Sequence, residues 1–536
     1  MRGTELTPAA GAPPQDDART PGRPGGRRRP GPVPLAIAGL TLLGLGVRLY
    51  LLSRPGYLLG VTQYDDGPYF GSALRLVRGA LPYRDFIIVQ PPGITLLMSP
   101  AALLAQVAGT AQGMAAGRIL TVAASSAGVL LTGLLLRRRG LLAVTLACGM
   151  LAIFPGSLIA AHTVLLEPWL TLFCLAGGLA VLDGDRLATG RRLVAGGLAF
   201  GFAGAVEAWA ILPVAVLVAC CGRDIRRTAR FLAGVAAGFA VPVLPFAALA
   251  PSRFYSSVIA AQLLRVVRRP APLLPRLRMM TGLGQLLHLG GPGVLALALG
   301  LVVFVAGALL LSWRAGRGPL TALDVFAVGS CALVAAAFLT YPQFFPHFPA
   351  FLAPFLAMSA GLAAARLAGT APATARRAEA AVAAAAALAV LVLTVQQAYG
   401  ERRVTPRVSP AAIAAVQRMV RPGACVLTDQ VSYTIAAGRF YAGNPRCALL
   451  VDSIGTDYAL GHGRDGASGA ARYPAVAAVW REALHQAQYV WLTTGYNRRR
   501  IAWTPALRSY FHGHFRPVLR DGRRDVLYAR LPARHG

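Results

Sequence analysis

The sequence predicts a polytopic, all-α membrane protein that carries an α/β domain at its C-terminus. Of its 536 residues, 55% are hydrophobic and only 14% are charged, whereas soluble domains carry about 25% charged residues. Apolar runs of about 20 residues, long enough to cross a bilayer core of about 30 Å, recur between residues 34 and 398. Polar sequence replaces them from residue 400 onward. This composition excludes an ordinary soluble enzyme.

The first element is a tail over residues 1–32. It is rich in proline, glycine and arginine, a composition that cannot bury a core, so we expect a disordered, basic, cytoplasmic segment. Twelve apolar segments follow as candidate spans: 34–53, 93–109, 117–136, 140–156, 164–182, 193–206, 207–222, 229–250, 292–312, 320–340, 348–366 and 378–398. Segment 93–109 is short and contains Pro100, so we expect it to be re-entrant or partly inserted. The prediction is therefore about 11 transmembrane helices, with 12 or 13 as alternatives.

Arginine clusters between these segments predict the topology, because positively charged loops stay in the cytoplasm. Eleven crossings place all five clusters, among them Arg137-Arg138-Arg139, on the cytoplasmic side. If segment 93–109 does cross, this triple arginine lies outside or a later pair of spans is miscounted. The prediction is a multi-pass plasma-membrane protein with a cytoplasmic N-terminus. Loops 54–92 and 251–291 and the C-terminal domain are then extracytoplasmic.

Residues 399–536 are expected to form the α/β domain. Short strand-like runs occur at 425–428, 489–493 and 526–529, with a helical stretch at 474–487. The length suffices for one small domain. Cys425 and Cys447 would both face an oxidising compartment, where they either pair or remain two free thiols.

The net charge of +32 comes from 53 basic residues against 21 acidic ones, and every basic residue is an arginine. The absence of lysine excludes Schiff-base chemistry and a lysine general base. The arginines lie mainly in tails and loops between apolar runs, where membrane topology and lipid headgroups explain them. We therefore expect no nucleic-acid partner.

The first outer loop holds the most informative motif, the adjacent carboxylates Asp65 and Asp66 in Tyr-Asp-Asp-Gly-Pro at 64–68. Such charge beside lipid is costly unless it is solvated or used. It fits a general base or a metal ligand, but Asp-Gly-Pro also fits a solvated turn. Apolar residues at helical spacing over 69–77 indicate a helix at the membrane interface. Gly-Ala-Leu-Pro-Tyr-Arg-Asp-Phe at 79–86 and Gln-Pro-Pro-Gly at 90–93 follow.

Together these motifs resemble the GT-C glycosyltransferases, specifically the protein O-mannosyltransferase and aminoarabinose-transferase-like family. The resemblance covers residues 33–398 and implies a GT-C-like fold. It also implies transfer of a sugar from a polyprenyl-phosphate carrier to an acceptor on the outer face, usually with inversion. The acceptor, whether protein, glycan or lipid, stays open.

The resemblance assigns roles to individual residues. Asp65 matches the first acidic position and is the expected general base, with Asp66 raising its basicity or helping to hold a cation. Glu167, which opens a span, is a candidate second carboxylate. The resemblance leaves a divalent cation open as a cofactor, and the residues establish no metal motif.

Three further residues are candidates for substrate binding. Asp85 belongs to the motif at 79–86. Glu207 stands where relatives often carry lysine, so the resemblance does not imply a carrier-phosphate role there. His347 lies in Tyr-Pro-Gln-Phe-Phe-Pro-His-Phe-Pro at 341–349, which resembles the family's late outer loop; an ordinary interfacial histidine is the alternative.

The outer loop 251–291 carries six arginines. Arginine binds phosphate oxygens in a bidentate fork, so this loop is a candidate site for the carrier phosphate, with Arg265, Arg268 and Arg269 as the expected ligands. Contact with anionic lipid headgroups is the alternative.

Two other functions compete with glycosyl transfer. A transporter or flippase of a lipid-linked substrate would show two related halves and ionisable residues near the bilayer midplane, and the sequence shows neither. A noncatalytic cell-envelope binding protein would depend on residues 400–536 rather than on Asp65.

Overall fold

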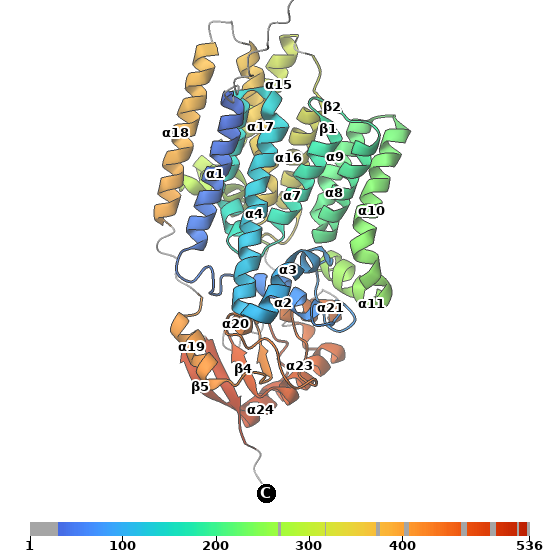
Figure 1. The fold of residues 1–536 in the computed structure, drawn as a ribbon, viewed down its shortest axis with the longest axis vertical. Coiled ribbons are helices and arrows are strands. Elements are labelled where there is room, and N and C mark those ends of the chain that lie inside the picture. The colour runs from blue at the N-terminus through green and yellow to red at the C-terminus, as the bar shows by residue number, and fades with distance from the viewer. Residues whose placement is uncertain are drawn as a thin grey trace, which may run out of the picture.

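The computed structural model describes residues 31–265, 270–316, 318–370, 376–400, 407–461, 469–493, 500–522 and 525–532. Helices within residues 32–400 form a bundle along the long axis of the molecule, and the C-terminal domain caps one end of it (Figure 1). The chain is a polytopic α-helical membrane protein with a C-terminal α/β domain, as the sequence predicts.

The longer helices of the bundle are α1 (Pro32–Leu52), α4 (Thr110–Leu136), α10 (Ile225–Leu249), α15 (Gly291–Arg314), α16 (Ala322–Thr340), α17 (Pro349–Thr370) and α18 (Arg376–Gly400). Shorter elements are α2 (Asp66–Leu76), α3 (Gly93–Ala108), η1 (Arg137–Arg139), α5 (Leu141–Ile153), α6 (Pro155–Ala161), α7 (Glu167–Val181), α8 (Arg191–Val206), η2 (Ala208–Ala210) and α9 (Ile211–Cys221). Loop 251–291 folds into α11 (Pro251–Phe254), η3 (Tyr255–Ala260), α12 (Ala261–Leu263), α13 (Leu273–Thr281) and α14 (Leu283–Leu286).

Seven helices in the described part of the chain are long and apolar enough to cross a membrane on their own. The pair α5 and α6, bent by 53° at the break before Pro155, makes an eighth if it counts as one span. Helices α3 and α7 and the segment Ala208–Cys221 are apolar but shorter. The expected count of about eleven spans therefore depends on these shorter helices and stays a prediction.

The two ends of the bundle differ in charge. The hairpin of β1 (Leu182–Asp183) and β2 (Arg186–Leu187) lies at the end away from the C-terminal domain (Figure 1). There, Arg139 of the triple arginine lies 2.6 Å from Asp185 and 3.4 Å from buried Asp324. Arg138 and Arg192, which belong to two different arginine clusters, both approach Asp183 there, at 3.8 and 3.6 Å. The orientation of the termini stays a prediction.

The C-terminal domain contains a four-stranded sheet in the order β3-β4-β6-β5, made of β3 (Val426–Thr428), β4 (Tyr489–Leu492), β6 (Asp525–Arg530) and β5 (Phe515–Asp521). Strands β3 and β4 are parallel, and the other neighbours are antiparallel. Its helices are α19 (Pro410–Met419), α20 (Val431–Ala436), α21 (Ser453–Leu460), α23 (Pro474–Gln486) and α24 (Pro505–His514). The core of the sheet and helices includes Trp480, Val490 and Phe511.

Two glycines of the outer-loop motifs permit close approach of distant segments. A Cβ on Gly67 would lie 2.5 Å from the Ser432 hydroxyl of α20, so glycine lets the C-terminal domain contact the start of α2. A Cβ on Gly93 would lie 2.4 Å from the Ala205 carbonyl oxygen, near the end of α8. These motifs therefore bring α2, α3, α8 and the C-terminal domain together.

A disulfide joins Cys425, just before β3, to Cys447, 22 residues along the chain. Of the two alternatives that the sequence leaves open, the structure contains the paired form. The crosslink ties the loop after α20 to the sheet.

We expect Cys425→Ser/Cys447→Ser to lower the free energy of unfolding by about 3 kcal/mol, because closing a loop of this length restricts the unfolded chain by about that amount. Thermal unfolding with and without the substitutions measures the loss, with Cys220→Ser as a free-cysteine control. An unchanged unfolding midpoint in the double variant would contradict the expected contribution.

Candidate active site

The acidic pair begins α2, and its second member is fully anchored. Asp66 is completely buried. Its Oδ2 lies 2.9 Å from Arg118 Nη2 of α4 and accepts hydrogen bonds from Thr163 (2.6 Å) and Thr62 (3.0 Å). Its Oδ1 accepts a bond from Ser432 Oγ at 2.7 Å. A buried charge with this many partners is stable and has little capacity left for a substrate.

Asp65 differs sharply from its neighbour. Its side chain is partly exposed, and no described residue forms a hydrogen bond or ion pair with its carboxylate. Desolvation by the surrounding protein raises its pKa to about 6, His347 opposes the rise, and the negative charges of Asp452, Glu167 and Asp66 add to it. A free carboxylate with such a pKa is ionised at neutral pH and basic enough to accept a proton.

Glu167 and His347 lie close enough to Asp65 to interact with it electrostatically. Glu167 begins α7, and His347 lies just before α17; both are buried. Their atoms Oε1 and Nε2 are 3.6 Å apart, while Glu167 Oε2 is buried without a hydrogen-bond partner. Burial lowers the pKa of His347, and the negative charge of Asp65 opposes that decrease. The ring stacks on Phe345 at 5.5 Å.

Glu207 adds a further carboxylate at the break between α8 and η2. Its side chain is 8% exposed, and Oε2 is buried without a hydrogen-bond partner. It interacts electrostatically with Glu167 and Asp65. Four sequence-predicted residues, Asp65, Glu167, Glu207 and His347, thus gather around one point at the end of the bundle that faces the C-terminal domain.

The C-terminal domain supplies a fourth carboxylate to this cluster, Asp452, which sequence reasoning missed. Asp452 caps the start of α21, is 5% exposed and accepts a hydrogen bond from Tyr64 Oη at 2.9 Å. Its charge interacts with that of Asp65. In the sequence, an Asp-Ser pair before a helical stretch signals only a helix start, so nothing local could have revealed this placement.

Asp85 occupies a different position from the cluster. Its carboxylate accepts a hydrogen bond from the Leu81 amide at 2.7 Å and pairs with Arg84 at 2.8 Å. The Arg84 hydrogen bond lowers the pKa of Asp85. These contacts stabilise the turn of the motif at 79–86, in which Tyr83 has a φ of 67°.

Arg265 is the described arginine of loop 251–291 that approaches the cluster. Its Nη1 donates to Gln343 Oε1 at 2.8 Å, and its guanidinium lies 4.1 Å from the centre of the Tyr458 ring. Its Nε is buried without a hydrogen-bond partner, so the side chain retains donors for an anion. Arg268 and Arg269 lie outside the described residues.

Another arginine of this loop has a structural role. Arg276 is 3% exposed and donates to the carbonyl oxygens of Phe338 (2.9 Å) and Pro342 (3.1 Å), at and just beyond the end of α16. It satisfies carbonyl groups that a helix end leaves without partners. This contact explains one of the cations that the sequence alone assigns to phosphate or lipid.

No group of three or more histidine, cysteine, aspartate or glutamate side chains in the described residues is arranged to hold a metal ion. The chemical steps proposed below therefore use only side chains of the protein.

We expect Asp66→Ala to lower the free energy of unfolding by about 3 to 5 kcal/mol, because it leaves the Arg118 guanidinium buried without its counter-charge. Asp65→Ala is the matched control and is expected to leave stability nearly unchanged, since no described residue bonds its carboxylate. Denaturant unfolding of both variants in detergent measures the difference. Equal losses for the two variants would contradict the assigned anchoring role.

No family model matches the chain, and no curated protein matches its sequence. Solved structures do match its fold. ArnT from Cupriavidus metallidurans bound to undecaprenyl phosphate aligns with a TM-score of 0.58 at 16% identity, covering 94% of this chain and 98% of that one. The archaeal oligosaccharyltransferase AglB from Archaeoglobus fulgidus, in complex with an inhibitory peptide and a dolichol-phosphate, aligns with a TM-score of 0.51 at 13% identity, covering 85% of this chain and 69% of that one.

At these identities the comparison shows the fold alone. The chain shares the fold of ArnT over nearly its whole length, including the C-terminal domain, for which the sequence offered no resemblance. The fold expected from the outer-loop motifs is confirmed.

Proposed function

We propose that the protein is a membrane glycosyltransferase that moves a sugar from a polyprenyl-phosphate carrier to an acceptor hydroxyl outside the cytoplasm. The observation that carries this proposal is the pair at the start of α2, in which Asp66 is anchored while Asp65 is free in an acidic cluster. The fold shared with ArnT bound to undecaprenyl phosphate supports it. The arginine clusters at the opposite end of the bundle support this orientation.

In the proposed reaction, Asp65 accepts the proton of the acceptor hydroxyl as its oxygen attacks the anomeric carbon of the sugar. The bond from that carbon to the carrier phosphate breaks, and its electron pair leaves on the phosphate. A single displacement of this kind inverts the configuration at the anomeric carbon. Arg265 stabilises the charge that develops on the departing phosphate, as expected of a preorganised cation near a leaving group.

The other predicted site residues have supporting roles in this proposal. Asp66 holds the start of α2 rather than contacting substrate. Glu167, Glu207 and His347 bind the hydroxyl groups of the sugar or acceptor. Glu167 Oε2 and Glu207 Oε2 have no hydrogen-bond partner among the described residues. Asp85 shapes the adjoining turn of the outer loop.

Asp65→Asn is expected to reduce donor consumption at least about 100-fold, because a positioned general base contributes about that much to the rate. The purified protein in lipid nanodiscs is mixed with a panel of polyprenyl-phosphate sugars and a cell-envelope extract as acceptor source, and loss of each donor is followed by mass spectrometry. Glu482→Gln, an exposed carboxylate of α23, is the control. A wild-type protein that consumes no donor would contradict the proposal and favour transport or binding.

The acid limb of the pH profile provides a second test. Burial raises the pKa of Asp65 to about 6, so the base is ionised above that pH and protonated below it. We therefore expect kcat/KM to fall as the pH drops through about 6, since this parameter reports the free enzyme. An acid limb near pH 4, the ordinary range of an aspartate, would exclude Asp65 in this environment as the base.

A further inference from the structure

Helix α21 of the C-terminal domain lies where that domain meets the outer loops of the bundle (Figure 1). Asp452 caps the helix, accepting a hydrogen bond from the Gly455 amide at 2.8 Å. The Asp452 backbone carbonyl accepts a bond from the Thr456 amide, also at 2.8 Å. These bonds fix the first turn of α21 as a rigid element beside the acidic cluster.

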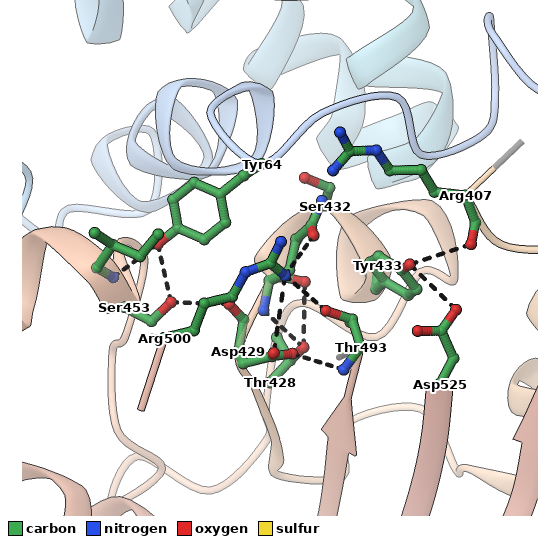
Figure 2. Close-up of polar contacts among 12 residues, drawn as sticks. Tyr64, Arg407, Thr428, Asp429, Ser432, Tyr433, Ser453, Thr493, Arg500 and Asp525 are labelled. Atoms are coloured by element: carbon green, nitrogen blue, oxygen red, sulfur yellow. Dashed lines mark hydrogen bonds and ion pairs between the residues drawn. The ribbon is translucent and has the colours of Figure 1, made fainter. Parts of the chain in front are cut away.

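The first turn of α21 contacts the loop that carries Asp65. The hydroxyl group of Tyr64 bonds to Asp452 Oδ1 (2.9 Å) and Ser453 Oγ (2.9 Å). It also accepts a bond from the Ile454 amide at 2.8 Å. Figure 2 shows the Tyr64 ring extending from the outer loop down to Ser453.

Neighbouring contacts fix the loop on both sides of Asp65. The Gln63 carbonyl oxygen accepts hydrogen bonds from Gln430 Nε2 (2.6 Å) and Ser432 Oγ (3.2 Å) of the C-terminal domain. Ser432 also bonds to Asp66. The C-terminal domain therefore holds residues 63, 64 and 66, whereas no described residue bonds to the carboxylate of Asp65.

The last turns of α21 contact the candidate phosphate ligand. The Tyr458 ring supports the Arg265 guanidinium at 4.1 Å, a cation–π contact. Arg265 also interacts electrostatically with Asp452. A bond from Gln262 Nε2 to the Val89 carbonyl oxygen, 3.0 Å long, ties the arginine-bearing segment to the first outer loop.

We propose that α21 is a positioning element that holds the base Asp65 and the phosphate-binding Arg265 at a fixed separation. It acts on Asp65 through Tyr64 and Asp452, and on Arg265 through Tyr458. This inference rests on the proposed function. A displacement reaction needs the base and the leaving-group ligand on opposite sides of one carbon, and a misplacement of about 1 Å costs about 100-fold in rate. One eight-residue helix that contacts both segments sets their separation.

The two contacts are expected to affect different kinetic parameters. Tyr64→Phe keeps the ring and removes the hydroxyl group, so kcat falls about tenfold while the Kd for undecaprenyl phosphate stays the same. Tyr458→Leu removes the aromatic face, so that Kd rises about tenfold. Tyr458→Phe restores the face and is expected to rescue binding. Native mass spectrometry of the full-length protein in nanodiscs measures undecaprenyl phosphate binding without any turnover.

The pH profile adds a readout that a general loss of stability would not produce. The ionisable groups that interact with Asp65 are His347, Glu167, Asp66, Asp452, Glu207 and Tyr69. Asp452→Asn removes a negative charge that raises the pKa of Asp65, so the acid limb moves to lower pH. Glu482→Gln, on the exposed face of the same domain, leaves the profile unchanged.

The outcomes separate this inference from the function on which it rests. A kcat effect confined to Tyr64→Phe, a binding effect confined to Tyr458→Leu and a shifted acid limb in Asp452→Asn would support it. An active wild type whose three variants keep wild-type kcat, Kd and pH profile would overturn the role of α21 alone. A wild type that neither consumes a donor nor binds undecaprenyl phosphate would overturn both proposals.

Discussion

The site depends on one buried ion pair, between Asp66 of α2 and Arg118 of α4. Arg118 also donates to the carbonyl oxygen of Leu58 at 2.9 Å, so the same guanidinium holds the loop before α2 as well as its first turn. Since a buried charge without a partner is costly, the loop is stable only in the position where Asp66 reaches Arg118. This constraint fixes where Asp65 lies and leaves its carboxylate without a partner.

Two adjacent carboxylates consequently have opposite environments. Hydrogen bonds and a cation stabilise the charge on Asp66, whereas desolvation and three neighbouring negative charges raise the pKa of Asp65. The C-terminal domain takes part in both, because Ser432 bonds to Asp66 and Asp452 faces Asp65. The domain therefore contributes directly to the candidate site.

The sequence predicts most of the fold and part of the site, for physical reasons that differ between elements. Apolar runs and Pro100 mark the bundle, and short strand patterns correctly indicate β3, β4 and β6 in the C-terminal domain. The acidic pair stands out because charge beside lipid is rare. Contacts between residues far apart in the sequence could not be predicted. Tyr64 and Asp452 are 388 residues apart, and no sequence motif indicates that they are partners. Periodicity likewise cannot separate an arginine that closes a helix end, such as Arg276, from one that faces a ligand.

The most direct test of the account is a cryo-electron microscopy structure of the protein in nanodiscs with undecaprenyl phosphate. The account predicts density for the phosphate within hydrogen-bonding distance of Arg265, with the acidic cluster around Asp65 open beside it. Phosphate density confined to the opposite end of the bundle, among the arginines near Asp185, would contradict the proposed site and favour a transport function.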